Sequence, residues 1–565
     1  MDSTVSDTLA RALAAWGVKR VYLSAGGAAT PLGEALRRCD ALHCILVCNG
    51  GCAAHAAVAE AQLTGRSAAC CGDCGAGVLA MLCAWYEAQR SATPLLGLLP
   101  LPDSELCGTD DAQNLRPETL LRDCSVLYRR AAHAGQLMPL AAAALRTARA
   151  RRSVGVLAVP SDVAAAPAAE QQIPPLPTPS ESAACPDGEA LLRMAELING
   201  AARVTFLCGI GCAAAKQDLI SLARRVQAPI AYTLRAKDVM EGDNPCEAGM
   251  TGLMGWGGAP VAVADCDLLV MWGTDFPFTE FLPAQTPVIQ VDTDAAALGR
   301  RVPLALGVHG DVREVARALL PLIRRNRGEE HLSAARCQHR RCVAELEGAV
   351  RAPDESAPLR PEYIMRLVSD LAEPDAVFTA DTGAPLLWAA RYLRTADSRR
   401  LIGSFRFGSP ACALAAAIGA KSAYPSRQVI ALCRADALNV NELRDLLRNN
   451  LAVKVFVFNS TGEYAVPPCD MAALARQLGL GAFRIDSTEE AGAAVKEWLA
   501  AHGAALLDAV TDGSICGEPP SLHLHRGAQK PLGFSLAGGL NALHRLLYGG
   551  GRGAEKADSR SGGDS

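Results

Sequence analysis

Residues 204–213 of the chain, VTFLCGIGCA, decide its fold class. Val204–Cys208 is an apolar run of strand length, Gly209-Ile-Gly211 is a glycine-rich turn, and a helix is predicted to start near Ala213. A strand, such a turn and a helix form the repeating unit of parallel sheets wrapped by helices. The helix N-terminus at such a turn can also accept a pyrophosphate. A Gly-x-Gly pair alone is weak evidence for this, because most such pairs are only tight turns.

The same alternation of short apolar runs and helical periodicity extends in both directions along the chain. One predicted helix is Ser6–Trp16, closed by Gly17 as a C-terminal cap. The sequence therefore predicts an α/β fold with three doubly wound parallel-sheet domains in series. The predicted strands are Val18–Ser24, Cys44–Val47, Ala68–Cys71 and Leu95–Leu99 in the first domain, Val204–Cys208, Pro229–Tyr232, Leu268–Trp272 and Val288–Asp292 in the second, and Ala376–Ala380, Val429–Cys433 and Val453–Asn459 in the third.

Two proline-rich stretches, residues 165–188 and 351–361, divide the chain into blocks of single-domain size. The predicted domains are residues 1–165, 188–345 and 360–530. Residues 549–565 carry almost nothing apolar to bury, so we expect a disordered tail there.

Composition restricts the classes of function. The 565 residues carry a formal net charge of -4 with scattered lysines and arginines, so we expect no nucleic-acid partner. The first 15 residues do not resemble a signal peptide. No apolar stretch reaches the roughly 18 residues that a membrane span needs. We therefore expect a cytoplasmic protein whose partner is a small molecule that the sequence does not identify.

The chain has 21 cysteines, and six of them cluster in the first predicted domain. Their spacings match no standard ligand pattern for a metal or cluster site. We interpret them as reduced, buried residues that act as small hydrophobic side chains. The six are Cys44, Cys48, Cys52, Cys70, Cys71 and Cys74.

Six longer strings, in order along the chain, resemble a known family. They are EAQLTGRSAACCGDCGAG (60–77), LPDSELCGTDDAQ (101–113), MTGLMGW (250–256), WGTDFPF (272–278), WAARYL (388–393) and LIGSFRFGS (401–409). Together they resemble the thiamine diphosphate- and FAD-dependent pyruvate oxidases, specifically the bacterial pyruvate:quinone oxidoreductase branch, from about residue 4 to 545. The resemblance implies pyrimidine-binding, FAD-binding and pyrophosphate-binding domains in that order. It also implies a homo-oligomer, a dimer or a tetramer.

The resemblance implies FAD as a cofactor of the second domain. Asp292 ends the predicted strand IQVD, where a carboxylate can accept hydrogen bonds from the adenosine ribose. The alternative is that the matching residues only hold the domain together. The implied cofactor-binding residues are Gly209, Gly211, Arg235, Thr251, Gly252, Leu253, Met254, Thr274, Asp275, Phe276, Pro277, Phe278, Asp292, Gly408 and Ser409.

Thiamine catalysis in the family uses a glutamate beside the pyrimidine ring, where it exchanges a proton with the ring nitrogen. The matching position, within ILVCNGGCAAHAA (45–57), is Gly50, which has no proton to exchange. His43 and His55 lie nearby in the sequence, but the periodicity points them elsewhere. Glyoxylate carboligase, a member of the family, works without this glutamate, so Gly50 alone does not exclude activity.

The family also binds Mg²⁺ to the diphosphate, through a Gly-Asp-Gly turn and a later asparagine. Here the strand VIALC (429–433) is followed by Arg434-Ala435-Asp436, and Ser460 stands at the asparagine position. We expect that the turn has lost its metal, because alanine offers no ligand and arginine replaces a glycine. The alternatives are that Asp436 substitutes after a local shift or that Arg434 contacts a phosphate directly.

Three further features of the thiamine site differ from the family. Residues 75–78 read GAGV in place of Gly-Pro-Gly-Asn, and Ala112 replaces an aromatic residue before Gln113. The segment after Tyr464 is shortened where the family folds a loop over the thiazolium. The surrounding shell still matches the family at Asp381–Gly383, Gly403–Phe405 and Gly408–Ser409.

Two main hypotheses follow. In the first, the protein is a pseudoenzyme, an FAD-binding pyruvate oxidase-like flavoprotein with no catalytic residue at the thiamine site. In the second, it is an active thiamine diphosphate- and FAD-dependent oxidoreductase that decarboxylates pyruvate and passes electrons to a quinone through atypical ligands. A flavin-only redox protein is a third hypothesis. Residues 540–548 precede a polar tail without an apolar face, so we expect no docking to membranes.

Overall fold

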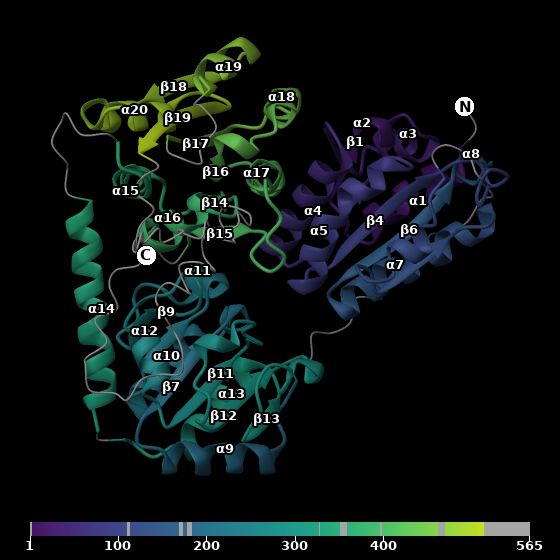
Figure 1. Cartoon of the computed structure of the whole chain (residues 1–565). Coiled ribbons are helices and arrows are strands. Elements are labelled where there is room, and N and C mark those ends of the chain that lie inside the picture. The colour runs from purple at the N-terminus through teal and green to yellow at the C-terminus, as the bar shows by residue number, and fades with distance from the viewer. Residues whose placement is uncertain are drawn as a thin grey trace, which may run out of the picture. The chain divides into compact units, whose positions relative to one another are not determined.

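The computed structural model describes residues 3–109, 114–168, 173, 175–177, 184–326, 328–350, 359–395, 398–461 and 469–512 (Figure 1). All of these residues belong to one compact unit, Met1–Ser521. Several predictions concern residues outside the described ones. They are the tail 549–565, residues 540–548, Ala112 and Gln113, the start of the segment at Tyr464, and parts of the two proline-rich stretches.

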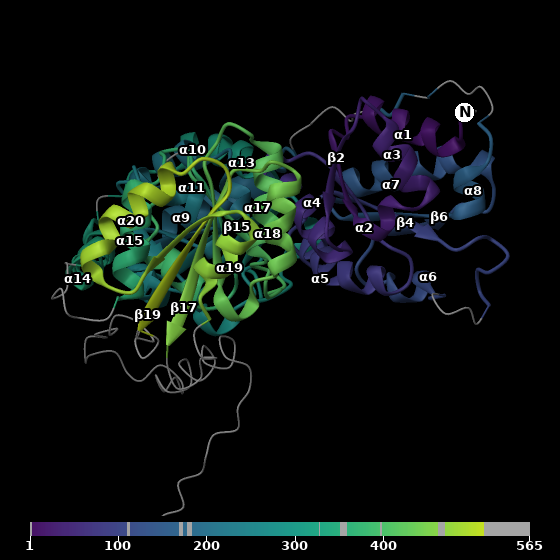
Figure 2. The ribbon, with the colours of Figure 1, turned by 90° about the horizontal axis from the view of Figure 1, so that it is seen from above.

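The first sheet is built from β1 (Arg20–Ser24), β2 (His43–Val47), β3 (Ala68–Cys71), β4 (Leu95–Leu101), β5 (Leu127–Arg130) and β6 (Val154–Pro160). All pairs are parallel, in the order β2-β1-β3-β4-β6-β5. Its helices are α1 (Val5–Ala15), α2 (Ala25–Ala28), α3 (Pro31–Arg38), α4 (Gly50–Thr64), α5 (Ala76–Arg90), α6 (Pro117–Leu120), α7 (Ala134–Arg151) and α8 (Ser161–Ala165). Helices α4 and α5 cover one face and α1 and α7 the other (Figure 2). Because both faces are covered, the central strands read as continuous apolar runs.

The middle sheet is built from β7 (Val204–Cys208), β8 (Ile230–Tyr232), β9 (Glu247–Met250), β10 (Trp256–Gly257), β11 (Leu268–Trp272), β12 (Val288–Asp292) and β13 (Leu306–His309). The order is β10-β9-β8-β7-β11-β12-β13, and only β10 runs antiparallel to its neighbour. Its helices are α9 (Gly188–Gly200), η1 (Ile210–Cys212), α10 (Lys216–Val226), η2 (Leu234–Ala236), α11 (Lys237–Met240), α12 (Ala259–Ala264), η3 (Thr279–Phe281), η4 (Ala295–Ala297), α13 (Val312–Leu319), η5 (Leu320–Leu322) and α14 (Glu330–Ala349).

The third sheet is built from β14 (Val377–Ala380), β15 (Arg400–Gly403), β16 (Val429–Arg434), β17 (Val453–Thr461), β18 (Gly481–Ile485) and β19 (Ala505–Asp512). All pairs are parallel, in the order β15-β14-β16-β17-β19-β18. Counted from its first strand, this order is the same as that of the first sheet. Its helices are α15 (Pro361–Leu371), α16 (Ala384–Tyr392), α17 (Ala413–Ala423), η6 (Ala435–Ala437), α18 (Val440–Arg448), α19 (Met471–Leu478) and α20 (Thr488–Ala500).

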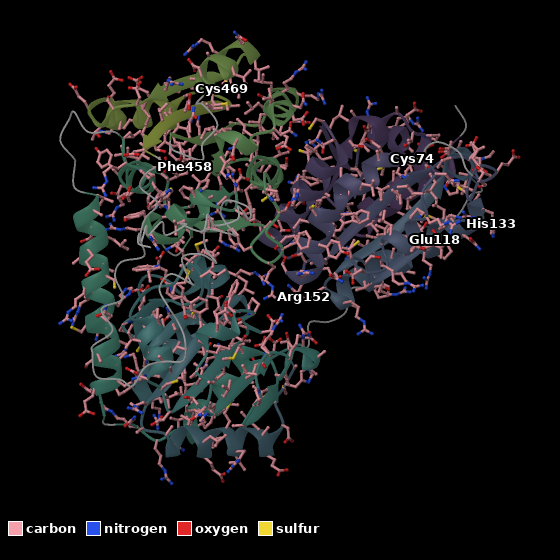
Figure 3. All side chains as sticks on the ribbon, viewed as in Figure 1. Cys74, Glu118, His133, Arg152, Phe458 and Cys469 are labelled. Carbon is pink, nitrogen blue, oxygen red and sulfur yellow. The ribbon has the colours of Figure 1, made fainter. Side chains whose placement is uncertain are left out.

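The predicted fold class is confirmed, because the described residues form three parallel-dominated α/β sheets in series. The helix predicted over Ser6–Trp16 is α1, and Gly17 follows it with a φ of +87°. The helix predicted near Ala213 begins later, at Lys216, because the turn first continues as the short helix η1. Side chains fill the layers between sheets and helices (Figure 3). None of the helices in the described ranges combines the length and apolar character needed to cross a bilayer.

The first and third sheets share an apolar core through helices α4 and α17. Gly419 of α17 lies against the backbone of α4 at Ala56. A Cβ atom at Gly419 would overlap the Ala56 carbonyl oxygen and lie 2.7 Å from its carbonyl carbon. Beneath this crossing, the Tyr22 hydroxyl donates to Glu60 Oε2 at 2.7 Å. The crossing therefore depends on a residue without a side chain.

A polar junction joins the middle and third sheets. Lys237 is fully buried and forms an ion pair with Glu241. The Glu241 carboxylate also accepts the backbone N–H of Thr395 at 2.8 Å. Next to this junction, the Tyr232 hydroxyl donates to Glu247 at 3.1 Å. The junction therefore places two carboxyl groups close together in a region with little water.

The pKa of Glu247 makes this junction sensitive to pH. Burial, together with the Glu241 charge, raises the pKa of Glu247 from 4.5 to about 7. Since the folded state holds this proton more tightly, the stability that the group contributes is complete below pH 4.5 and is lost as the pH rises through about 7. Replacing Glu247 with glutamine is expected to raise the free energy of unfolding at pH 8 by ~1–2 kcal/mol, a value reduced to allow for solvent screening at this partly exposed group, and to leave it unchanged near pH ~4. Urea unfolding at the two pH values measures the difference, and an equal gain at both would contradict it.

Candidate functional site

The residues with predicted flavin contacts in the middle domain all lie at carboxyl ends of strands. The sheet order places β7 beside β11, where the order of the strands reverses. Ligands of open parallel sheets bind outside the carboxyl ends of the strands at such a point. Gly209 and Gly211 follow β7, Arg235 lies in η2 after β8, Thr251–Met254 follow β9, Thr274–Phe278 follow β11, and Asp292 ends β12.

The glycine-rich turn after β7 packs directly against the turn after β11. A Cβ atom at Gly209 would overlap the Gly273 carbonyl oxygen, and one at Gly211 would lie 2.8 Å from the Gly273 Cα. The Gly209 amide donates to the Trp272 carbonyl at 2.8 Å, and the Gly211 amide donates to the Gly273 carbonyl at 3.2 Å. Both glycines are therefore required for packing. A pyrophosphate at this edge would have to use other donors.

The turn after β9 contains a buried hydroxyl group. Thr251 is 3% exposed, and its Oγ1 has no hydrogen-bond partner among the described residues. Gly252 follows with a φ of +100°, and a Cβ atom there would lie 3.1 Å from the Phe276 ring. Because an unpaired buried hydroxyl is costly, this turn fits a ligand that brings a polar atom to Thr251. Of the remaining candidates, Leu253, Met254, Thr274 and Phe278 are half-buried, and Pro277 is exposed.

Three arginine side chains form ion pairs with the Asp275 carboxylate. Arg406 of the third domain donates to both carboxylate oxygens of Asp275, at 2.9 and 3.2 Å. Arg300 and Arg301 add ion pairs at 3.3 and 3.6 Å. Burial acts to raise the pKa of Asp275, but the three arginines outweigh it and hold the pKa below its usual range. Asp275 therefore joins two domains, whether or not it also meets a ligand.

The other two charged candidates, Arg235 and Asp292, are partly buried. Arg235 donates to the Ser91 carbonyl at 3.2 Å, and burial lowers its pKa to about 10, so it is charged at neutral pH. Asp292 accepts the Asp294 amide at 2.9 Å, and burial raises its pKa. Together they offer a fixed positive charge and a hydrogen-bond acceptor, which is the combination that a dinucleotide requires.

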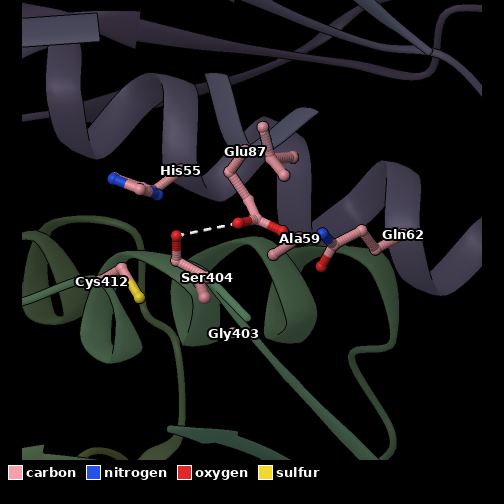
Figure 4. Close-up of a pocket in the computed structure, with 9 residues that line it drawn as sticks. His55, Ala59, Gln62, Glu87, Gly403, Ser404 and Cys412 are labelled. Carbon is pink, nitrogen blue, oxygen red and sulfur yellow. Dashed lines mark hydrogen bonds between the residues drawn. The ribbon is translucent and has the colours of Figure 1, made fainter. Parts of the chain in front are cut away.

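Gly408 and Ser409 lie in the loop after β15, beside a very small cavity. Gly408 has a φ of +80°, and the Ser409 amide donates to Ser404 Oγ at 2.9 Å. Ser409 Oγ lies 3.2 Å from His55 Nε2, and burial lowers the pKa of His55 to about 4, so the ring is neutral. The cavity, lined by His55, Ser404 and Glu87 among others, measures about 10 Å³ (Figure 4). It has room for no more than a water molecule, so these residues organise a loop here.

Glu87 of α5 is a site residue that the sequence analysis missed. Its side chain is buried, and Oε2 accepts a hydrogen bond from Ser404 Oγ at 3.0 Å (Figure 4). The same oxygen accepts hydrogen bonds from the Arg406 amide at 3.1 Å and the Phe407 amide at 2.8 Å. The feature of the sequence that could have revealed Glu87 is its position on the buried face of α5, where the other residues are apolar. A carboxylate on such a face indicates a buried partner.

The expected glutamate position, Gly50, is the first residue of α4. A Cβ atom at Gly50 would lie 2.8 Å from the Gly77 carbonyl oxygen and 3.0 Å from the Met81 Cγ. Both residues belong to the start of α5, and Met81 also lies over Gly72. The space that the activating carboxylate would need is therefore occupied by α5.

The two expected metal-ligand positions do meet in the fold, because Ala435 and Ser460 lie at the carboxyl ends of the parallel neighbours β16 and β17. Alanine offers no ligand. The adjacent carboxylate, Asp436, is held by Arg434, with 2.9 Å between Nε and Oδ1. Since Mg²⁺ requires oxygen ligands that include a carboxylate free to bind, the residues at these positions do not fit a magnesium diphosphate group.

Comparisons with known proteins match all three parts of the chain. The profiles described as thiamine pyrophosphate enzyme, N-terminal TPP binding domain, central domain and C-terminal TPP binding domain match residues 3–118, 191–319 and 381–463. YdaP of Bacillus subtilis, provisionally named as thiamine pyrophosphate-containing, is 30% identical over 536 residues, 92% of each chain. Pyruvate oxidase of Lactiplantibacillus plantarum is 26% identical over 89% of this chain and 88% of its own. The large subunit of acetolactate synthase isozyme 1 of Escherichia coli is 26% identical over 79% of each chain.

Proposed function

This chain belongs to the family of thiamine pyrophosphate enzymes, and from that premise we propose that it is a pyruvate oxidase-like flavoprotein that binds FAD and is silent in thiamine chemistry. The observation that carries the proposal is at Gly50, where the Gly77 carbonyl and the Met81 side chain fill the space of the activating carboxylate. Thiamine diphosphate is the cofactor of the family. However, a general acid–base group must lie within hydrogen-bond reach of the proton that it moves, and position 50 supplies none.

The FAD part of the proposal is supported by the carboxyl edge of the middle sheet. Arg235 and Asp292 would hold the pyrophosphate and the ribose, and the buried Thr251 hydroxyl would gain a polar partner. A bound flavin would supply electron transfer at this edge. Phe276 and Phe278, 5.7 Å apart between ring centroids, would form an apolar wall that excludes water.

The assignment to the pyruvate oxidase branch is also part of the proposal. The acetolactate synthase large subunits of Escherichia coli and Parasynechococcus marenigrum are 26% and 30% identical to the chain, but they are matched over 79% and 75% of their length, against 88% for the pyruvate oxidase at 26% identity. The strings MTGLMGW and WGTDFPF, which resemble flavin contacts of that branch, favour the same assignment. We further propose a cytoplasmic homo-oligomer, a dimer or tetramer, whose partner is a small molecule and not a nucleic acid.

The cofactor content of the purified protein tests the proposal. We expect about one FAD per chain, measured by absorbance after denaturation. We expect no heat of binding when thiamine diphosphate and Mg²⁺ are added in a calorimeter. Thiamine binding in the range of about 1 μM that requires Mg²⁺, together with pyruvate turnover, would establish the active oxidoreductase instead. Flavin-free protein that does not take up added FAD would remove the flavin from the proposal.

A pair of threonine variants locates the flavin. Thr251→Val is expected to weaken FAD binding by ~3–10-fold, because it removes one hydrogen-bonding group from the turn. Thr488→Val is the matched control, since Thr488 Oγ1 is also buried without a partner among the described residues but lies on α20 of the third domain. Fluorescence titration of the apoprotein with FAD measures both. Equal affinities for the two variants would place the flavin elsewhere.

A further inference from the structure

Three side chains that could bind a metal meet where α4 begins and α18 passes. They are Cys48, just before α4, Cys52 in its first turn, and Asp445 in α18. One ligand atom from each lies within 4.8 Å of the others. Asp445 comes from a different domain, so the spacing of the cysteines could not have indicated this group.

Hydrogen bonds hold the three side chains in place. The Cys48 amide donates to Asp445 Oδ2 at 2.7 Å, which leaves Oδ1 as the atom that can bind a cation. Asn49 lies between the cysteines, where its Oδ1 accepts the Cys52 amide at 2.9 Å and its Nδ2 donates to Cys48 Sγ at 3.2 Å. Groups that orient ligands in this way are a regular part of metal sites.

One oxygen of the buried Asp445 carboxylate has no hydrogen-bond donor among the described residues. Asp445 is 0% exposed, and its Oδ1 accepts no hydrogen bond from the described residues. Among the described residues, Arg448 forms an ion pair with this same oxygen, with its Nη1 3.3 Å from Oδ1, and the arginine side chain is 44% exposed. A buried carboxylate oxygen with so little compensation is costly unless a cation binds there.

We propose that Cys48, Cys52 and Asp445 bind a zinc ion, with water as the fourth ligand. Two sulfur ligands and one carboxylate suit Zn²⁺ and not Mg²⁺ or Ca²⁺. A tetrahedral zinc with bonds to sulfur of about 2.3 Å holds two sulfurs ~3.8 Å apart, so adjustment of side-chain torsions brings these ligands into place. The two thiols release their protons as they bind the ion.

The zinc site does not depend on the proposed flavoprotein function. It would link the start of α4 to α18 and so tie the first domain to the third. Gly50, the expected glutamate position, lies between the two cysteine ligands in the chain.

Metal analysis of the full-length protein, purified without chelator, tests the site. We expect about one zinc per chain in the wild-type protein. Cys48→Ser, Cys52→Ser and Asp445→Asn are each expected to weaken zinc binding by at least ~100-fold, more than the loss of an outer-shell partner. Cys83→Ser, which changes an exposed cysteine on α5, is the matched control and should keep its zinc. Substitution with Co²⁺ should give thiolate-to-cobalt absorption that the Cys48 and Cys52 variants lose.

A further variant separates metal binding from folding. Arg448→Ala removes the exposed cation that competes for Asp445, so it should raise the affinity for Zn²⁺, measured against a chelator of known affinity. Lower affinity in this variant would overturn the proposal. Wild-type protein that neither contains nor takes up Zn²⁺ would do the same, as would zinc retained by the Cys48/Cys52 double variant. A disulfide between Cys48 and Cys52 in fresh protein, in place of zinc, would also overturn it.

Discussion

Replacing Gly419 with alanine is expected to lower the free energy of unfolding by ~3 kcal/mol, because overpacking at this position cannot be relieved by a side chain. The new methyl group would overlap the Ala56 carbonyl oxygen and lie 2.7 Å from the carbonyl carbon. Both atoms belong to the backbone of α4, so the whole helix must shift. The Gly419 carbonyl also accepts the buried Tyr22 hydroxyl at 3.3 Å, and the shift would disturb that contact.

Urea unfolding measures the effect, with Gly492→Ala as the matched control. Gly492 lies inside α20, and a Cβ atom there has nothing within 4 Å. The control should stabilise the chain by ~0.5–1 kcal/mol, because alanine favours the helix and reduces the freedom of the unfolded chain. A glycine-to-alanine substitution should thus destabilise the protein at position 419 and stabilise it at position 492. Equal effects would mean that α4 and α17 do not cross at Gly419.

The fold was predictable because its central strands are buried on both faces. VIALC is apolar throughout, VTFLC is apolar except for the buried Thr205, and helices cover both sides of the strands that they form, β16 and β7. The edge strands β5 and β18, with the sequences LYRR and GAFRI, were not predicted, and an edge strand does not need a continuous apolar run. The central strands β6 and β19 were not predicted either, although VGVLAVP of β6 is apolar throughout.

The candidate site could be predicted only in part. The absence of a carboxylate at Gly50 can be read from the chain, but its replacement by Met81 depends on how α5 packs. Likewise, Cys48 and Cys52 show their spacing in the sequence, whereas Asp445 joins them only through the contact between two domains. Pairings between distant segments depend on the tertiary structure, and local patterns do not carry that information.

Replacing Glu87 with alanine is expected to lower the free energy of unfolding by ~3–4 kcal/mol, because it leaves buried donors without their charged acceptor. The Arg406 and Phe407 amides and the Ser404 hydroxyl all donate to Glu87 Oε2. Ser91 Oγ donates to Oε1 at 2.7 Å. A single carboxylate of the first domain thus accepts the hydrogen bonds of a loop in the third domain. Among the described residues, no other group accepts a hydrogen bond from the Arg406 or Phe407 amide.

Urea unfolding and hydrogen exchange measure the consequence together. In Glu87→Ala, the Arg406 and Phe407 amides should exchange ~10–100-fold faster, because the loop opens locally before the chain unfolds. Glu87→Gln keeps one oxygen acceptor and should lose about half as much stability. Glu497→Ala removes an exposed glutamate from α20 and should change stability by less than ~0.5 kcal/mol. If Glu87→Ala loses no more stability than Glu497→Ala, the Glu87 carboxylate does not hold the two domains together. A larger loss of stability in Glu87→Ala than in Glu87→Gln, with fast amide exchange confined to the loop, shows that it does.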